Sequence, residues 1–153
     1  MPIFTCSARL RCAALMALTG GAVAQTMSLW GGDLARFLPP LPVMQGFGVA
    51  GAGLAGLVLA DAFGRAGWRG AVWSCLAWPL ATIFGAVTGA ALLAFEVTRS
   101  PGAMLIKAVS EGAPLGIMAL MDGIATSPAV ATIWLASGLA MHSGARVERD
   151  VTT

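Results

Sequence analysis

Charged side chains are scarce in this chain of 153 residues, which has nine Lys and Arg and seven Asp and Glu. They make up 10% of the sequence, whereas soluble domains carry roughly 25%. A soluble fold of this length has a large surface, which so few charges would cover poorly. The scarcity of charge therefore argues against a soluble protein. The net charge of +2, without a basic patch that contains aromatic residues, also argues against nucleic acid as a partner.

The residue types that build catalytic and metal sites are few as well. The chain has one histidine, His142, and three cysteines, Cys6, Cys12 and Cys75, which have neither C-x-x-C nor any other metal-ligand spacing. A Ser-His-Asp or Cys-His set cannot be assembled convincingly around His142, and no P-loop or pair of catalytic carboxylates is present. We therefore expect no enzymatic activity, no cofactor and no metal site.

The absence of charge extends over three long stretches of the sequence. These stretches lie between Arg11 and Asp33, between Arg36 and Asp61, and between Arg69 and Glu96. A helix needs about 20 predominantly apolar residues to cross a hydrocarbon core of roughly 30 Å. With a mean hydropathy of +0.82, the pattern predicts an all-α, polytopic membrane helical bundle that forms a single domain over residues 1–153.

Four spanning helices are expected, at about residues 12–30, 41–62, 70–95 and 128–143. The start of the last one is indicated by Ser127 as N-cap and Pro128 at the first helical position. The first segment has a second interpretation, because Ala22-Val-Ala24 before Gln25 resembles a signal-peptide cleavage site. Removal of residues 1–24 would leave three spanning helices.

Residues 104–124 predict a different kind of helix, which lies on the membrane surface. Lys107, Glu111, Met118 and Asp122 fall within about 60° of one another on a helical projection. Three of these four residues are charged, and most of the apolar residues lie off this strip. We expect an interfacial amphipathic helix.

Three charged residues are candidates for a functional role. Asp122 would lie at membrane depth if the last helix began at Leu115, and carboxylates there usually serve proton or cation pathways. A break at Ser127 would instead place Asp122 at the outer interface, which we favour. Glu96 and Arg99 close the third segment, where they would act as interfacial anchors or as a local ion pair.

The distribution of basic residues predicts the orientation of the helices. Lys and Arg are enriched in cytoplasmic loops. With the N-terminus in the cytoplasm, the cytoplasmic side carries six basic residues: Arg9, Arg11, Arg65, Arg69, Arg146 and Arg149. The outer side carries three, which are Arg36, Arg99 and Lys107. We expect both termini in the cytoplasm, with residues 144–153 as a cytoplasmic tail.

The glycine-rich residues 46–64 match a nucleotide-binding motif as a string of letters. Gly51, Gly53 and Gly56 fit the G-x-G-x-x-G fingerprint. That fingerprint requires a strand before it and an acidic residue about 20 positions later, and the sequence provides neither. We therefore expect no flavin or other dinucleotide.

The same residues form a stripe of small side chains if the segment is helical. Positions four apart along a helix share one face, and small residues there let a neighbouring backbone approach closely. The stripe comprises Gly48, Ala52, Gly56, Ala60 and Gly64, and the next segment has Gly85 and Gly89. We expect the second and third segments to cross near Gly56 and Gly85. Alternatively, the stripe could meet another membrane subunit or a second copy of this chain.

Several short pieces resemble TrgA-type membrane proteins, a bacterial family associated with tellurite resistance. The pieces are Met1-Pro2, Ala8–Leu10 with Ala13–Leu18, Gly64–Gly70, Phe95–Val97 and Thr126–Val130. The resemblance implies a link to tellurite tolerance and supplies no catalytic residues. We expect a non-enzymatic bacterial inner-membrane protein in the lipid bilayer. The alternatives are an accessory subunit or assembly factor of a larger complex, and a small transporter or channel that uses Asp122.

Overall fold

The part of the chain that the structure describes is all-helical and contains no strand. A computed structural model describes residues 6–38, 43–99, 102, 106, 110–111 and 113–152. The long helices are α1 (Cys6–Trp30), α2 (Val43–Leu59), α3 (Gly67–Thr98), α5 (Ala113–Thr126) and α6 (Pro128–Thr152). Two short 3₁₀ helices, η1 (Asp33–Phe37) and η2 (Ala60–Ala62), follow α1 and α2. The all-α prediction is confirmed.

Within the described residues, three segments are long and apolar enough to cross a membrane. They are Cys6–Trp30, Gln45–Ala62 and Gly67–Glu96. Helices α5 and α6 pass the same test only as a pair, and they bend by 114° at the break between them. The structure is therefore compatible with a membrane protein that has three spanning helices, or four if the bent pair forms one span.

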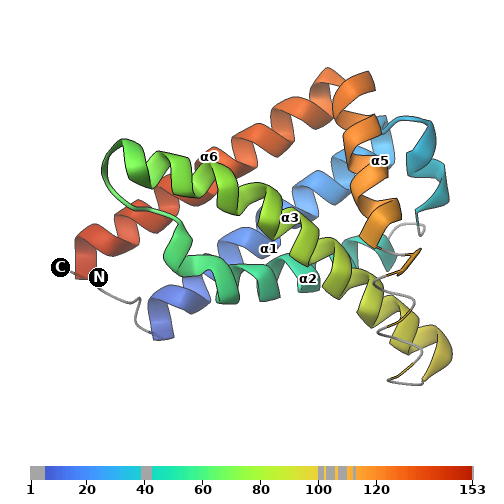
Figure 1. The fold of residues 1–153 in the computed structure, drawn as a ribbon, viewed down its shortest axis with the longest axis horizontal. Coiled ribbons are helices and arrows are strands. Elements are labelled where there is room, and N and C mark those ends of the chain that lie inside the picture. Colours follow the sequence, from blue (N-terminus) through green and yellow to red (C-terminus); the bar gives the residue numbers. More distant parts are fainter. Residues whose placement is uncertain are drawn as a thin grey trace.

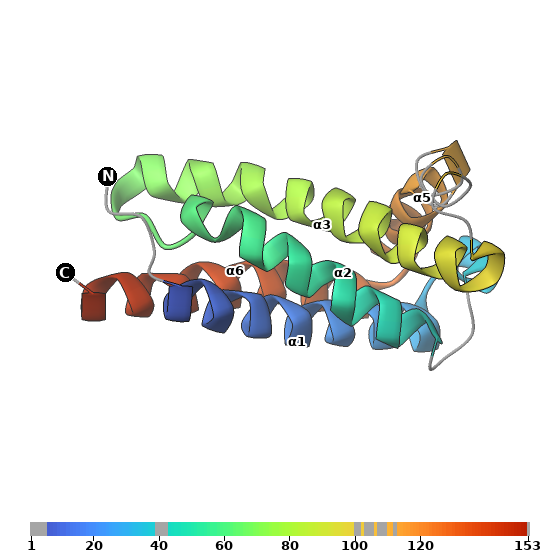
Figure 2. The same cartoon turned by 90° about the horizontal axis from the view of Figure 1, so that it is seen from below.

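The helices pack in an antiparallel order that brings distant parts of the chain together. In Figure 2, α1 and α6 run side by side in one layer, α3 runs in a second layer, and α2 lies between them. Helix α5 packs against η1, α3 and α6. As Figure 1 shows, the start of α1, the turn between α2 and α3, and the end of α6 lie at the same end of the bundle.

The break between α5 and α6 follows from local hydrogen bonding. Ser127 Oγ accepts a hydrogen bond from the Val130 backbone N–H at 3.5 Å, as an N-cap residue does. Pro128, which has no N–H to donate, occupies the first position of α6, where that loss has no cost. Helix α6 therefore begins at the residue expected from the sequence.

The last helix extends further than expected. Helix α6 continues past residue 143 to Thr152, so residues 144–152, which were expected as a cytoplasmic tail, are helical. The extension packs on the rest of the protein, because Ala145 is fully buried and a Cβ at Gly64 would overlap its backbone. Thr153 lies outside the described residues.

The predicted helix over residues 104–124 coincides with α5 only in its second half. Met104, Leu105 and Lys107 lie outside the described residues, and α5 begins at Ala113. Within α5, Ala119 and Leu120 are buried while Met118 is exposed, so the helix has one face on the bundle. The placement of this helix at a membrane interface stays a prediction.

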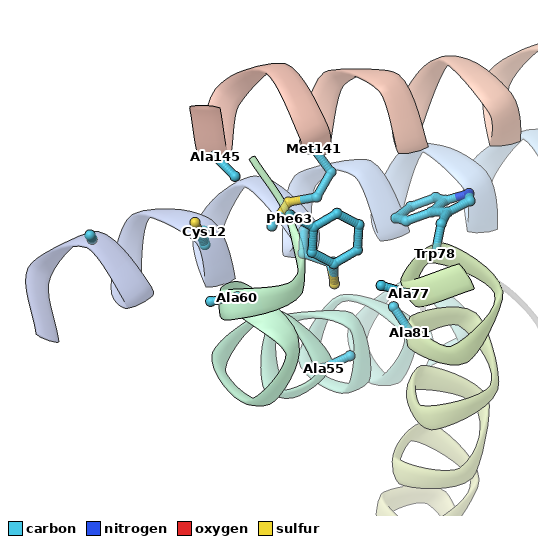
Figure 3. Packing of buried hydrophobic residues seen from close by; sticks show 11 residues of the cluster. Cys12, Ala55, Ala60, Phe63, Ala77, Trp78, Ala81, Met141 and Ala145 are labelled. Carbon is cyan, nitrogen blue, oxygen red and sulfur yellow. The ribbon is translucent and has the colours of Figure 1, made fainter. Parts of the chain in front are cut away.

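Phe63 lies at the centre of the largest cluster of buried side chains. It follows η2 directly and is fully buried. Figure 3 shows its ring among Met141 of α6, Cys12 of α1 and Ala77 of α3. A loop residue thus connects three helices, and truncation of a buried Phe to Ala typically costs about 3–5 kcal/mol.

Candidate functional site

The seam between α3 and α6 contains a serine–histidine pair in which Ser74 is buried and His142 is half-buried. Ser74 Oγ lies 2.6 Å from His142 Nδ1, and 7% of Ser74 is exposed. The two residues are far apart in the sequence and meet because α3 and α6 pack together. In the described part of the chain, Ser74 is the hydrogen-bond partner found for His142.

A second polar group continues the same seam. Trp78 Nε1 donates to the Trp134 carbonyl at 3.1 Å, and Trp134 Nε1 donates to Thr82 Oγ1 at 3.2 Å. Thr82 Oγ1 in turn donates to the Trp78 carbonyl at 3.0 Å. The two indole rings are 6.1 Å apart at 43°. These hydrogen bonds form a closed circuit that holds α3 to α6.

Gly138 allows this seam to close. A Cβ at Gly138 would lie 2.9 Å from Trp78 Cδ1, which is closer than side-chain atoms normally approach. The hydrogen-bonded seam therefore depends on a missing side chain as well as on polar groups. Both indoles keep their N–H satisfied in this arrangement, as buried tryptophans generally do.

This seam is not predicted from the sequence, although its spacing is visible there. Ser74, Trp78 and Thr82 are four residues apart on α3, so they share one helix face. Trp134, Gly138 and His142 have the same spacing on α6. The spacing alone does not show that these two helix faces meet.

The Ser74–His142 pair acts as a hydrogen bond between helices. Nucleophilic catalysis requires, besides the nucleophile and its base, a third group that orients the base and donors for a developing oxyanion. The observed contacts supply the first pair only. In the described residues, no group of three His, Cys, Asp or Glu side chains is arranged to hold a metal ion.

An apolar cavity of about 330 Å³ adjoins the seam, between α1, α2, α3, α5 and α6. Its walls are rich in glycine and alanine. The small residues include Gly20 and Ala24 of α1, Gly48 and Ala52 of α2, and Ala86 and Ala90 of α3. Trp78, Thr82 and Trp134 form the wall that is shared with the seam.

Charged side chains gather at the end of the bundle where the α2–α3 turn lies. Arg9 forms an ion pair with Asp61, and Arg11 Nη1 contacts the Glu148 carboxylate at 3.0 Å. Arg149 donates to the Phe63 carbonyl at 3.0 Å and to the Asp61 carbonyl at 2.9 Å. These contacts connect the start of α1 and the end of α6 to the α2–α3 turn.

The small-residue stripe of α2 packs mainly against α1, and only Ala52 of the stripe also lies close to Gly85 of α3. A Cβ at Gly20 of α1 would overlap Ala52, and a Cβ at Gly48 would lie 3.6 Å from the Ala24 Cβ. A Cβ at Gly56 would lie 2.8 Å from the Ala13 Cα. The stripe of α1 that contains Gly20 and Ala24 is therefore its partner.

The predicted crossing of the second and third segments near Gly56 and Gly85 is wrong in its register. Gly85 lies opposite Gly51 and Ala52, more than one helical turn earlier on α2. Gly89 lies against the Phe47 backbone. The reason is geometric: residues 51 and 56 point to different sides of α2, so Gly56 meets α1 while Gly51 meets α3.

Two members of the stripe lie outside α2. Helix α2 ends at Leu59, so Ala60 belongs to η2, where it is fully buried. Gly64 has a φ of 70°, in the left-handed region that favours glycine, and serves the turn before α3. Helix α2 also runs without a break through Gly51, Gly53 and Gly56, which excludes the strand and turn of a dinucleotide fingerprint.

Asp122 is bonded to the loop after α1. Its Oδ2 accepts a hydrogen bond from the Leu34 backbone N–H at 2.9 Å, near the start of η1. A Cβ at Gly32 would overlap the same carboxylate, so the loop passes very close to α5. Asp122 is therefore half-buried and satisfies a backbone donor, while its place at the outer interface stays a prediction.

Glu96 and Arg99 are both exposed at the end of α3. Arg99 has a φ of 51° and its N–H donates to the Phe95 carbonyl at 2.7 Å, which ends the helix. No ion pair joins the two side chains in the described part of the chain. Interfacial anchoring remains the interpretation for both.

Comparison with known proteins identifies no relative of this chain: no family model matches it, and neither a curated protein nor a solved structure does.

Proposed function

We propose that the protein is a non-enzymatic, multi-pass protein of the bacterial inner membrane, in which α1, α2, α3 and α6 cross the bilayer and α5 lies at its surface. The observation that carries this proposal is the division between outward and inward side chains. Large apolar residues are exposed on the outward faces, among them Leu18 at 73% and Leu139 at 72%. The polar groups of the seam point inward and bond helix to helix. A bilayer favours this arrangement.

We infer that the end of the bundle with the α2–α3 turn faces the cytoplasm. The six arginines assigned to the cytoplasmic side are carried by the start of α1, the α2–α3 turn with the start of α3, and the end of α6. Figure 1 places these segments at one end. Reporters fused after Thr152 and within residues 31–32 test the orientation. Cytoplasmic signal at the first position and periplasmic signal at the second support it, and the reverse result contradicts it.

The resemblance to TrgA-type proteins supports a role in tellurite tolerance. The experiment compares tellurite sensitivity of a strain that lacks the gene with strains that carry the wild-type gene or a Trp78→Ala variant. We expect sensitivity to rise without the gene and the wild-type gene to restore tolerance, whereas Trp78→Ala restores less because it opens the α3–α6 seam. Equal tolerance with and without the gene would contradict this role.

We propose that helix packing is completed within one chain. The stripe that suggested a partner subunit contacts α1, through Gly48, Ala52 and Gly56. Co-purification from native membranes in mild detergent tests this, and recovery of the protein alone, as a monomer, is the expected result. A stoichiometric second subunit would favour the accessory-subunit alternative.

A further inference from the structure

We propose that the cavity beside the α3–α6 seam binds one acyl chain of a membrane phospholipid. The proposal rests on the membrane location given above. The cavity of about 330 Å³ is not fully enclosed by the helices. An apolar cavity of about 150 Å³ is enough to bind benzene, so this one has room for a longer hydrocarbon segment.

The lining offers a ligand almost no polar partner. Thr82 Oγ1 already accepts a hydrogen bond from Trp134 and donates one to the Trp78 carbonyl. The Trp134 carbonyl accepts from Trp78 Nε1. A buried water needs about three hydrogen bonds, so the cavity is a poor site for water. It is equally unsuited to a polar or charged ligand, whose desolvation would not be compensated.

The shape of the cavity is produced by missing side chains. Helices α1 and α2 approach each other through Gly20, Gly48 and Ala52. On α3, the residues that line the cavity include Ala86 and Ala90, which have short side chains. Atoms that line an empty cavity lack dispersion contacts on one side. The protein is therefore more stable when a ligand fills the cavity. Phospholipid chains are the most abundant apolar groups around a spanning helix, and they require no polar anchor.

The experiment uses the two tryptophans that line the cavity as reporters. A variant with Trp30→Phe, Trp68→Phe and Trp73→Phe keeps only Trp78 and Trp134. It is reconstituted into phosphatidylcholine vesicles whose acyl chains are either plain or brominated, since bromine quenches indole fluorescence at short range. Co-flotation with the vesicles first shows that the protein is inserted. Failure of this step would count against the membrane proposal, separately from the cavity.

Filling variants then test whether the quencher reaches the indoles through the cavity. Ala90→Leu and Ala86→Leu each add volume to the wall, and Ala50→Leu on the exposed face of α2 is the matched control. We expect brominated chains to remove most of the emission in the parent and in the control. Either filling variant, if helical content is retained, should recover much of it.

Two outcomes would overturn the proposal. Equal quenching in the parent and in both folded filling variants would show that bromine acts from outside the bundle. Little quenching in an inserted parent would show that the cavity is closed to phospholipid chains or holds another molecule. Quenching that both filling variants relieve and the control does not would support an acyl chain at this site.

Discussion

At the scale of single residues, the contact each glycine makes decides whether it can be replaced. Gly56 and Gly53 both lie on α2, and both face α1. A Cβ at Gly56 would lie 2.8 Å from the Ala13 Cα, whereas a Cβ at Gly53 would lie 3.5 Å from the Ala17 Cβ. The first distance requires a backbone to move, and the second is an ordinary contact.

We therefore expect opposite effects from two identical substitutions. Gly56→Ala should lower the free energy of unfolding by about 1–3 kcal/mol through overpacking. Gly53→Ala should leave it unchanged or raise it by up to about 1 kcal/mol, because Ala favours a helix over Gly. Titration with sodium dodecyl sulfate, followed by tryptophan fluorescence, measures both. Similar values for the two variants would contradict the α1–α2 contact.

Asp122 offers a second test at this scale, because it acts as an N-cap acceptor supplied from another helix. Asp122→Ala leaves the Leu34 N–H without this acceptor, and loss of a cap costs about 1 kcal/mol. Asp122→Asn retains a side-chain oxygen and should cost less. The same detergent titration measures the difference, and ion flux into vesicles is the control. If Asp122→Asn abolished the ion flux and left the stability unchanged, the result would instead favour the transporter alternative.

At the scale of elements, the end of α6 is a structural part of the bundle. Arg149 donates to the carbonyls of Phe63 and Asp61, while Arg146, one turn earlier, is exposed. Arg149→Ala should destabilise the protein by about 1–3 kcal/mol, since hydrogen bonds to charged groups are stronger than neutral ones. Arg146→Ala is the matched control and should change the unfolding midpoint little. Equal shifts would show that only net charge matters.

A helix boundary can be predicted from the sequence where local backbone chemistry determines it. It cannot be predicted where contacts with distant residues determine it. Ser127 and Pro128 fix the start of α6 through their own backbone properties, so the sequence indicates it. The end at Thr152 depends on Ala145 and Arg149 meeting the α2–α3 turn, which no local pattern encodes. The register between α2 and α3 was missed for the same reason, since a stripe shows which residues are small but not which neighbour they face.

The functional residues were predictable to a smaller extent. The position of Asp122 in an apolar segment marks it as unusual, but its partner Leu34 is distant in sequence and carries no signal. Ser74 and His142 were each visible, yet their contact depends on how α3 and α6 are packed. Composition predicts where polar groups are rare, and the fold determines which of them meet.

At the scale of the whole molecule, α1 is integral to the bundle. It contributes Ala8, Cys12 and Met16 to the core around Phe63, and all three are almost fully buried. Loss of residues 1–24 would remove these contacts, so we expect the mature protein to retain them. N-terminal sequencing of protein purified from membranes tests this. A sequence that starts at Gln25 would mean that the signal-peptide interpretation is correct and that three helices remain.

The position of Phe63 has a consequence for the order in which the protein matures during synthesis. Its ring packs against Met141, which the ribosome adds long after α1, α2 and α3 have been made (Figure 3). The three earlier helices therefore have an incompletely packed centre until α6 is synthesised. During that interval the nascent chain would be most exposed to quality-control proteases, and any delay in translating α6 would lengthen its vulnerable period.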